Sequence, residues 1–191
     1  MSTQPAGDVV AITQLINLYG LAMDTQRWDL FDDIFTSDVD ADYGPTSHWT
    51  DLEQFKSDFA VFHAPFDSTQ HTMSTHVVQL DGDRAHSFCN GGWRLVRKAV
   101  DGNPLWDGTG WYDDTWLRTP DGWRIARRVC RIAWWTGDPF VNETIPGVKF
   151  TLTTTVLRDD AAAGRVGALA ARGSPVRNER RGRDGRYRDP L

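Results

Sequence analysis

Hydrophobic residues in the first third of the chain recur at intervals of three and four positions. This spacing places apolar side chains on one face of a helix. It predicts a first helix over residues 12–23, with Asp8 capping its N-terminus. A short second helix is expected over 27–35 and a first strand over 39–43. A third helix, ended by Pro65, is indicated by the apolar residues Leu52, Phe55, Phe59 and Phe62.

From residue 70 onward the pattern changes to β-rich runs separated by short loops of Asp, Gly, Asn and Pro. The runs cover residues 70–80, 84–96, 105–117 and 123–135. Short loops of this composition are typical of hairpins, so neighbouring strands should be antiparallel. Helices followed by an antiparallel sheet are the α+β pattern, with the helices packed on one face of the sheet.

The chain of 191 residues is long enough for one domain with a sizeable core. We expect that domain over residues 1–158 and a C-terminal extension over 159–191. The extension begins with alanine-rich segments that predict weak helix. From residue 172 it is rich in Arg, Gly and Pro, which indicates disorder. Acidic residues dilute its arginines, so we interpret it as a solvated tail rather than a site for an anionic partner.

The formal net charge of -5 argues against nucleic-acid binding by the body of the protein. No apolar run is expected to approach the roughly 18 residues of a membrane span, and the N-terminus lacks the order of a secretory signal. A soluble cytoplasmic protein is therefore expected. Cys89 and Cys130 lie in predicted strands and are expected to be buried free thiols.

The sequence gives no sign of a metal or cofactor site. It contains no HxxxH motif, no paired cysteine motif, no GxGxxG motif and no phosphate-binding loop. We therefore expect catalysis, if any, without a metal or cofactor. The aromatic content is high, with nine Trp, nine Phe and four Tyr. Most of these rings should pack in the core, and some are expected to line a pocket for a small molecule.

Asp24, at the end of the first predicted helix, and His71, at the start of a later strand, are the candidate catalytic pair. A histidine titrates near neutral pH and suits a general base. A carboxylate bonded to one ring nitrogen would fix its tautomer and stabilise the imidazolium. The alternative is an Asp24 side chain in water, although a negative charge at a helix C-terminus opposes the helix dipole.

Other histidines compete with His71 for this role. His76 follows it by five positions, which on a regular strand places the two side chains on opposite faces unless a bulge intervenes. His48, His63 and His86 are interpreted as loop or surface residues. The neighbouring pair of glycines at 91 and 92 is interpreted as a kink that lets the sheet bend.

The order of elements and four segments of the chain resemble the SnoaL-like branch of the nuclear-transport-factor-2-like superfamily. The segments are LYGLAMD (18–24), FTSDVDADY (35–43), HTMSTHVVQLDGD (71–83) and DGWRIARR (121–128). Within that branch the chain is most similar to the group of scytalone dehydratase, bile acid dehydratase and hexachlorocyclohexane dehydrochlorinase. The resemblance implies a cone-shaped barrel: a strongly curved, mixed but mostly antiparallel sheet wrapped by N-terminal helices around an apolar pocket.

The resemblance also implies roles for particular residues. In that group an Asp at the end of the first helix orients a strand His that removes a proton, and Asp24 and His71 match these by position. Tyr43 occupies a place similar to that of a substrate-contacting Tyr of scytalone dehydratase. Met23 stands where that enzyme has a second Tyr, a departure that puts the same substrate in doubt. Further candidates for substrate binding are Tyr19, Trp93, Trp111 and Arg128, with Asn90 also considered.

These expectations favour a cofactor-independent lyase that removes water or HX from a hydrophobic cyclic or aromatic small molecule. A polyketide cyclase or a ketosteroid-type isomerase is an alternative within the same fold. A different class of alternative is a ligand-binding protein or the non-catalytic small subunit of an aromatic-ring dioxygenase. The chain is expected to form a homodimer or homotrimer that buries an apolar sheet face, with no nucleic-acid or membrane partner.

Overall fold

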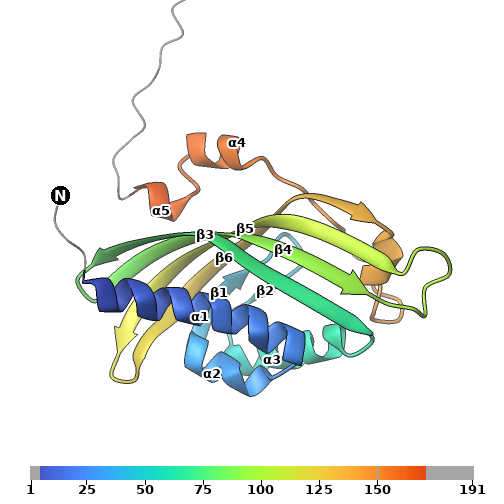
Figure 1. Cartoon of the computed structure of the whole chain (residues 1–191), viewed down its shortest axis with the longest axis horizontal. Coiled ribbons are helices and arrows are strands. Elements are labelled where there is room, and N and C mark those ends of the chain that lie inside the picture. Colours follow the sequence, from blue (N-terminus) through green and yellow to red (C-terminus); the bar gives the residue numbers. More distant parts are fainter. Residues whose placement is uncertain (1–4, 150, 171–191) are drawn as a thin grey trace, which may run out of the picture.

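Six strands form one curved sheet in the order β2-β1-β6-β5-β4-β3 in the computed structural model, which describes residues 5–149 and 151–170 (Figure 1). The strands are β1 (Phe35–Asp42), β2 (His48–Trp49), β3 (Ser68–Asp81), β4 (Arg84–Val96), β5 (Leu105–Thr119) and β6 (Gly122–Gly137). Within this sheet β1 and β6 run parallel, and the other neighbouring pairs are antiparallel. The predicted α+β fold with a mixed, mostly antiparallel sheet is confirmed.

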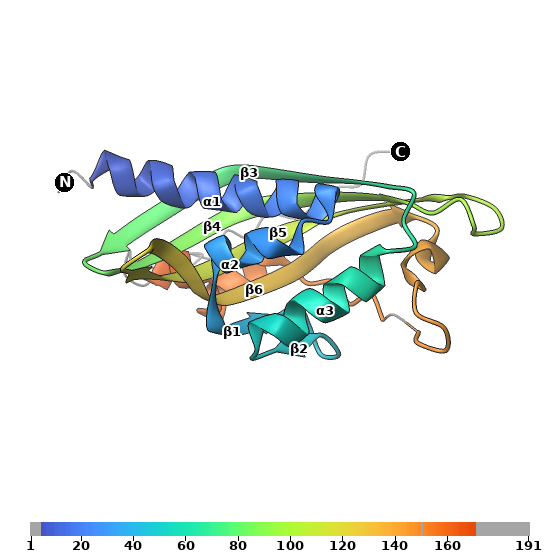
Figure 2. The same ribbon diagram turned by 90° about the horizontal axis from the view of Figure 1, so that it is seen from below.

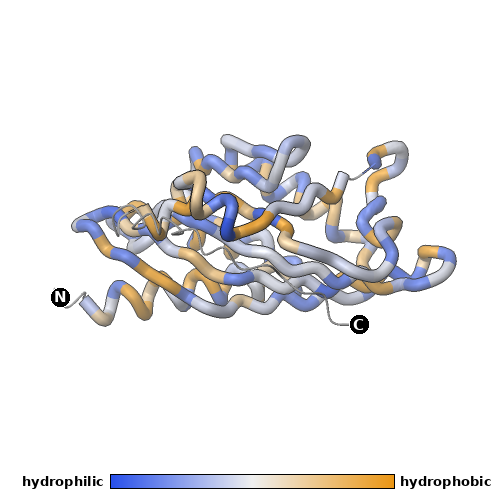
Figure 3. Tube along the Cα trace, turned by 90° about the horizontal axis from the view of Figure 1, so that it is seen from above, coloured by the Kyte–Doolittle hydropathy of each residue, from blue (hydrophilic) through white to orange (hydrophobic). Residues whose placement is uncertain are grey.

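The N-terminal helices cover one face of the sheet, which we call the inner face (Figures 1 and 2). They are α1 (Ala6–Thr25), the 3-10 turn η1 (Trp28–Leu30), α2 (Phe31–Ile34) and α3 (Leu52–His63). The stripe of α1 with Ile12, Ile16, Tyr19 and Met23 is buried, as its periodicity predicts. Hydrophobic and hydrophilic residues interleave along the chain in Figure 3, as expected for elements with one buried side.

Two expectations for α1 were wrong. Pro5, not Asp8, occupies the N-cap. Asp8 lies in the first turn and accepts bonds from Arg118 (2.7 Å) and from the indole of Trp123 (2.9 Å), which tie α1 to the β5–β6 hairpin. The second wrong expectation was that no segment has the length and apolar composition of a membrane span, because Ala6–Thr25 has both. The core helix of a soluble protein passes the same test, and here Ile12 and Ile16 are fully buried inside the fold.

Glycines on the inner face make room for indole rings. A side chain at Gly91 would meet the Tyr112 ring at 2.7 Å and that of Trp93 at 3.0 Å, and one at Gly108 would overlap the ring of Trp106. The two indoles therefore lie against the backbone of β4 and β5. A side chain at these glycines would lift the rings off the sheet, so the glycines fix where the aromatic surface lies.

The C-terminal part of the described chain crosses to the opposite, outer face of the sheet. The 3-10 turn η2 (Pro139–Asn142) follows β6 at the end of the sheet, and the short helices α4 (Leu157–Ala162) and α5 (Gly167–Ala170) come after it on the outer face. The carboxylate of Asp113 accepts the backbone N–H groups of Gly167 (2.6 Å) and Ala168 (3.2 Å). Part of the predicted extension is thus packed on the sheet, whereas the predicted disorder of 172–191 lies outside the described residues.

Candidate active site

Asp24 and His71 are brought together where the last turn of α1 meets the beginning of β3. One carboxylate oxygen, Oδ1, lies 2.6 Å from His71 Nδ1. The other oxygen accepts the backbone N–H of His71 at 2.8 Å. Thr69 donates its hydroxyl to Oδ1 at 2.9 Å. The strand that carries the imidazole therefore also fixes the orientation of the carboxylate.

The protonation of this pair follows from its surroundings. Burial alone would raise the pKa of Asp24, but the hydrogen bonds from His71 and Thr69 outweigh it and hold the pKa below its ordinary value. Asp24 is thus a carboxylate at neutral pH and accepts the Nδ1–H of His71. In the neutral ring, Nε2 then carries a free lone pair. Among the described residues no group bonds to Nε2, and the His71 side chain is only 4% exposed.

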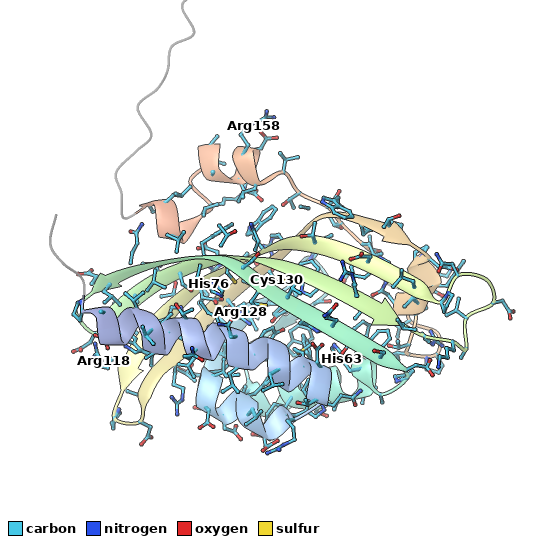
Figure 4. The ribbon with its side chains drawn as sticks, in the orientation of Figure 1. His63, His76, Arg118, Arg128, Cys130 and Arg158 are labelled. Carbon is cyan, nitrogen blue, oxygen red and sulfur yellow. The ribbon has the colours of Figure 1, made fainter. Side chains whose placement is uncertain are left out.

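A second histidine, His63, lies beside His71 with its ring centroid 6.3 Å away. It was predicted to be a loop or surface residue, and that prediction was wrong because α3 extends to it. Its Nδ1 donates to the backbone oxygen of Phe59 at 2.7 Å. Burial lowers the pKa of His63 to about 3, so the ring is neutral. Figure 4 shows it near the beginning of β3.

His76 lies at a β-bulge. The register of β3 against β4 shifts between Ser74 and Val77, and Thr75 has a positive φ of 55°. Two residues of β3 then oppose one residue of β4, so the alternation that would separate His76 from His71 is broken. Burial lowers the pKa of His76, and its Nε2 is buried without a partner among the described residues.

Tyr19 and Tyr43, both predicted to bind substrate, share a hydrogen bond of 2.9 Å between their hydroxyl groups. The Tyr112 ring, which sequence reasoning missed, packs against both. Its hydroxyl accepts a bond of 2.7 Å from the indole of Trp93, the cross-strand neighbour of His71. Burial raises the pKa of Tyr19 to about 12, so this phenol stays protonated and can donate a hydrogen bond.

Arg128 is fully buried, and Figure 4 shows it between α1 and the sheet. It forms two hydrogen bonds of 2.8 Å to Asp114, a partner that the sequence did not reveal. Its guanidinium carbon lies 4.2 Å from the ring centroid of Tyr19 and 4.5 Å from that of Tyr112. One terminal nitrogen, Nη1, has no hydrogen-bond partner among the described residues. The arrangement leaves one donor of a buried cation available.

The structure does not bring Trp111 to the other candidates. Trp111 pairs with Asn90 and Arg131, one position away from Tyr112, so its side chain belongs to the outer face. Asn90 belongs to the same outer face and donates to the hydroxyl of Thr75 at 3.1 Å. Neither residue can line the same pocket as His71 while the sheet keeps this register.

The surface hollow that the structure shows is also on the outer face. Its volume is about 40 Å³, and it is lined by Gln70, Thr72, Gly92, Arg94 and Asp107. It does not include His71, so the apolar pocket beside the pair stays a prediction. Within residues 5–149 and 151–170 no three His, Cys, Asp or Glu side chains are grouped to hold a metal ion.

The model of the SnoaL-like domain matches residues 4–129 of the chain. Uncharacterized proteins of Mycobacterium tuberculosis and Mycobacterium bovis are 34% identical over 139 residues, covering 68% of this chain and 88% of theirs. This match includes most of the relatives' length, so the similarity extends well beyond a single motif.

Solved structures share the fold at lower identity. The Kfla4162 protein from Kribbella flavida is 24% identical with a TM-score of 0.64, covering 68% of this chain and 93% of that one. A candidate scytalone dehydratase from Novosphingobium aromaticivorans is 18% identical with a TM-score of 0.62, covering 76% and 89%. A hexachlorocyclohexane dehydrochlorinase is 13% identical with a TM-score of 0.60, covering 74% and 91%. The family model and the 34% identical relatives show that the chain belongs to the SnoaL-like family, and the solved structures show that it has the nuclear-transport-factor-2-like fold.

Proposed function

We propose that the protein is a cofactor-independent lyase that removes water or HX from a hydrophobic cyclic or aromatic small molecule. The observation that carries the proposal is the 2.6 Å contact between His71 Nδ1 and Asp24, together with an Nε2 that has no partner among the described residues. This is the arrangement that a histidine needs to remove a proton.

The reaction starts when His71 Nε2 takes a proton from a carbon next to the one that bears the leaving group. The electrons of that C–H bond form the new double bond, and hydroxide or halide leaves with the electrons of its own bond. The resulting imidazolium is stabilised by the charge of Asp24, which is held ionised by its hydrogen bonds. A departing hydroxide takes up the proton from His71 and leaves as water. After loss of a halide, the imidazolium gives its proton to solvent water, and in both cases the base returns to its neutral form.

Negative charge that develops on the substrate needs donors away from the base. The proposed donors are the hydroxyl pair of Tyr19 and Tyr43 and the free Nη1 of Arg128. Burial raises the pKa of Tyr19 to about 12, so we assign the phenols hydrogen-bond donation rather than proton transfer. Trp93 and the phenol rings supply a flat apolar surface, which suits a cyclic or aromatic ligand.

The names of two structural neighbours agree with elimination chemistry, since one is a hexachlorocyclohexane dehydrochlorinase and another a candidate scytalone dehydratase. At 13% and 18% identity these neighbours share the fold, and the reaction assigned to this chain depends on its own residues.

The same base also permits isomerisation or cyclisation, in which the substrate keeps its mass. A ligand-binding protein or a non-catalytic subunit would convert nothing. The test is therefore incubation with chlorinated cyclohexanes and cyclic β-hydroxy ketones, followed by mass spectrometry of the products. Loss of hydrogen chloride or water supports the lyase, whereas an unchanged mass with a changed structure supports the alternative enzymes.

The same assay tests the base. His71→Ala should abolish turnover with little change in the melting temperature, because the side chain belongs to the site more than to the core. His48→Ala is the matched control, since His48 is an exposed histidine paired with Asp40 and should keep full activity. Turnover that survives in His71→Ala would remove His71 as the base and direct attention to His76 or an acidic residue.

A further inference from the structure

Buried polar atoms without hydrogen-bond partners gather at one end of the sheet. Of seven such side-chain atoms among the described residues, four are Arg97 Nε, Trp106 Nε1, Asn142 Nδ2 and Thr144 Oγ1. Trp106 and Asn142 are 3% exposed and Thr144 is 7% exposed. Burying a polar group without a partner is costly, so several in one place mark a position that a ligand can complete.

The segment after β6 folds back on the ends of β4 and β5 (Figure 1), which brings Asn142 and Thr144 next to Arg97 and close to the start of β5, where Trp106 lies. Asp138, at the start of this segment, donates its backbone N–H to the oxygen of Leu105 at 2.9 Å. Arg97, just after β4, donates Nη1 to the backbone oxygen of Glu143 at 2.6 Å. The η2 turn between these two bonds is thereby placed beside Trp106. We call Arg97, Trp106, Asn142 and Thr144 the η2 donor cluster.

Trp106, the member of the η2 donor cluster that belongs to a strand, lies on the same face of the sheet as the candidate base. His71 is the cross-strand neighbour of Trp93, and Trp93 is the cross-strand neighbour of Gly108. The ring of Trp106 lies over Gly108, where a side chain would overlap it. Two strand spacings, roughly 10 Å, therefore separate His71 from the Trp106 indole. A small ring with one substituent spans such a distance.

The chemistry of the η2 donor cluster selects an acceptor. An indole N–H, a guanidinium N–H and an amide NH₂ can only donate at these atoms, and the hydroxyl of Thr144 can do either. Arg97 adds a positive charge. The nearby carboxylate of Asp138 is already used, since it accepts the backbone N–H of Phe140 at 2.9 Å. A carboxylate ligand satisfies such a set best, because it offers two acceptor oxygens and the opposite charge.

We propose that the η2 donor cluster binds the carboxylate of a small cyclic or aromatic acid, whose ring lies against Trp93 and Trp106 and reaches toward His71. That this acid is the substrate rests on the proposed function, whereas the binding site does not. Because the four atoms are covered in this structure, the ligand enters when η2 moves away from the sheet. This movement breaks the hydrogen bonds from Arg97 to the backbone oxygens of Phe140 and Glu143 and exposes Val141, so the bound carboxylate has to compensate for both losses.

Binding is tested without turnover, by titrating the full chain with benzoate and following the indole N–H signals in ¹H–¹⁵N spectra. The signal of Trp106 is assigned from the spectrum of Trp106→Phe. Benzoate should shift that signal to saturation. Benzamide, with the same shape and no charge, should bind at least about tenfold more weakly, as expected for a charge-assisted hydrogen bond. Equal binding of the two ligands would overturn the carboxylate assignment.

Variants locate the site. Asn142→Ala and Thr144→Val should each weaken benzoate binding, the former by about tenfold, with folding checked by melting temperature. Trp134→Phe is the control, because Trp134 is 54% exposed and pairs with Thr109 on the outer face. Unchanged affinity in both Asn142→Ala and Thr144→Val would overturn the proposal. In an elimination assay with a cyclic β-hydroxy acid, a raised KM in Asn142→Ala supports the proposal, and an unchanged KM with a working His71 overturns it while leaving the lyase intact.

Discussion

The carboxylate of Asp24 determines which form of the His71 imidazole is presented to a ligand. It accepts both the ring N–H and the backbone N–H of the same residue. Rotation of either side chain would break at least one of these bonds, so the lone pair of Nε2 keeps one direction. Because the imidazole is already oriented in the folded protein, no free energy is needed to orient it during the reaction. This is the physical advantage of a base built on a strand rather than on a loop.

Asp24→Asn tests this assignment, because the amide keeps the shape but loses the charge. An Asn side chain can also turn its NH₂ toward His71 and favour the other tautomer, which would block Nε2. We expect turnover to fall by roughly a thousandfold or more, with the fold unchanged. The measurement is kcat in the elimination assay, together with the ¹⁵N signals of the imidazole. Full activity with an unchanged tautomer would contradict a role for the charge.

Arg128 offers a second test at the same scale. Arg128→Met leaves Asp114 as a buried, unpaired carboxylate, and we expect a loss of about 3–5 kcal/mol in the free energy of unfolding. The neighbouring Arg127 is the matched control, since its bond to Asp40 lies at the surface. Arg127→Met should cost about 1 kcal/mol or less. Urea unfolding of both variants measures the difference, and equal losses would argue against the buried pair as a structural element.

At single positions, the sequence predicted residues whose role follows from their place at the end or start of an element. It missed residues whose role depends on a partner in another strand. Asp24 and His71 were found because a helix end and a strand start can be located from periodicity and from family resemblance. Trp93 and Trp111 could not be assigned to different faces, because aromatic residues occur on both faces of their strands and the choice of face depends on the register. Asp114 was missed because its partner Arg128 comes from another strand.

At the scale of elements, boundaries explain the remaining differences. The aromatic spacing of α3 continues from Phe59 to His63, four positions later, yet a histidine was assigned to the loop because it is polar. The bulge at Thr75 inserts one residue into β3 and has no sequence signal such as glycine. It changed the direction of His76. Bulges and final helical turns are set by tertiary packing, so local patterns predict them poorly.

His63 gives α3 a pH dependence that can be measured. Its pKa is lowered from 6.5 to about 3 in the folded protein, so over that range the unfolded chain takes up a proton that the folded protein refuses. Stability should therefore decrease as the pH falls from about 6.5 toward 3. His76, whose pKa is also lowered, adds to the same effect. The lowered pKa of Asp24 acts only in the more acidic part of this range.

His63→Asn should remove most of this sensitivity, because Asn can still donate to the Phe59 carbonyl but does not titrate. The expected result is a smaller fall in melting temperature between about pH 7 and about pH 5 than in the wild type. His48→Asn is the control and should behave as the wild type, since His48 is exposed. A variant His63→Asn with the full acid sensitivity would show that another group is responsible.

At the scale of the whole molecule, the fold class was predictable because hairpin loops and helical stripes leave few ways to form one core. The role of the outer face of the sheet was not predictable. An apolar sheet face was expected to be buried between subunits, yet α5 packs on part of it and is held there by Asp113. Whether copies also associate stays a prediction. The alanine-rich composition of this region gave no sign of where it packs, because its main anchor, Asp113, is distant in sequence.

Truncation tests whether this cover matters. A chain ending at Val156 lacks α4 and α5, so Asp113 loses two N–H donors and the surface of β4 and β5 that α5 contacts is uncovered. Newly exposed apolar surface of this kind promotes self-association. We expect a larger oligomer by analytical ultracentrifugation and a lower melting temperature. A chain ending at Ala170 keeps α5 and should behave as the full chain. If the two truncations sediment alike, α5 does not shield the sheet, and the surface that subunits use must be sought elsewhere.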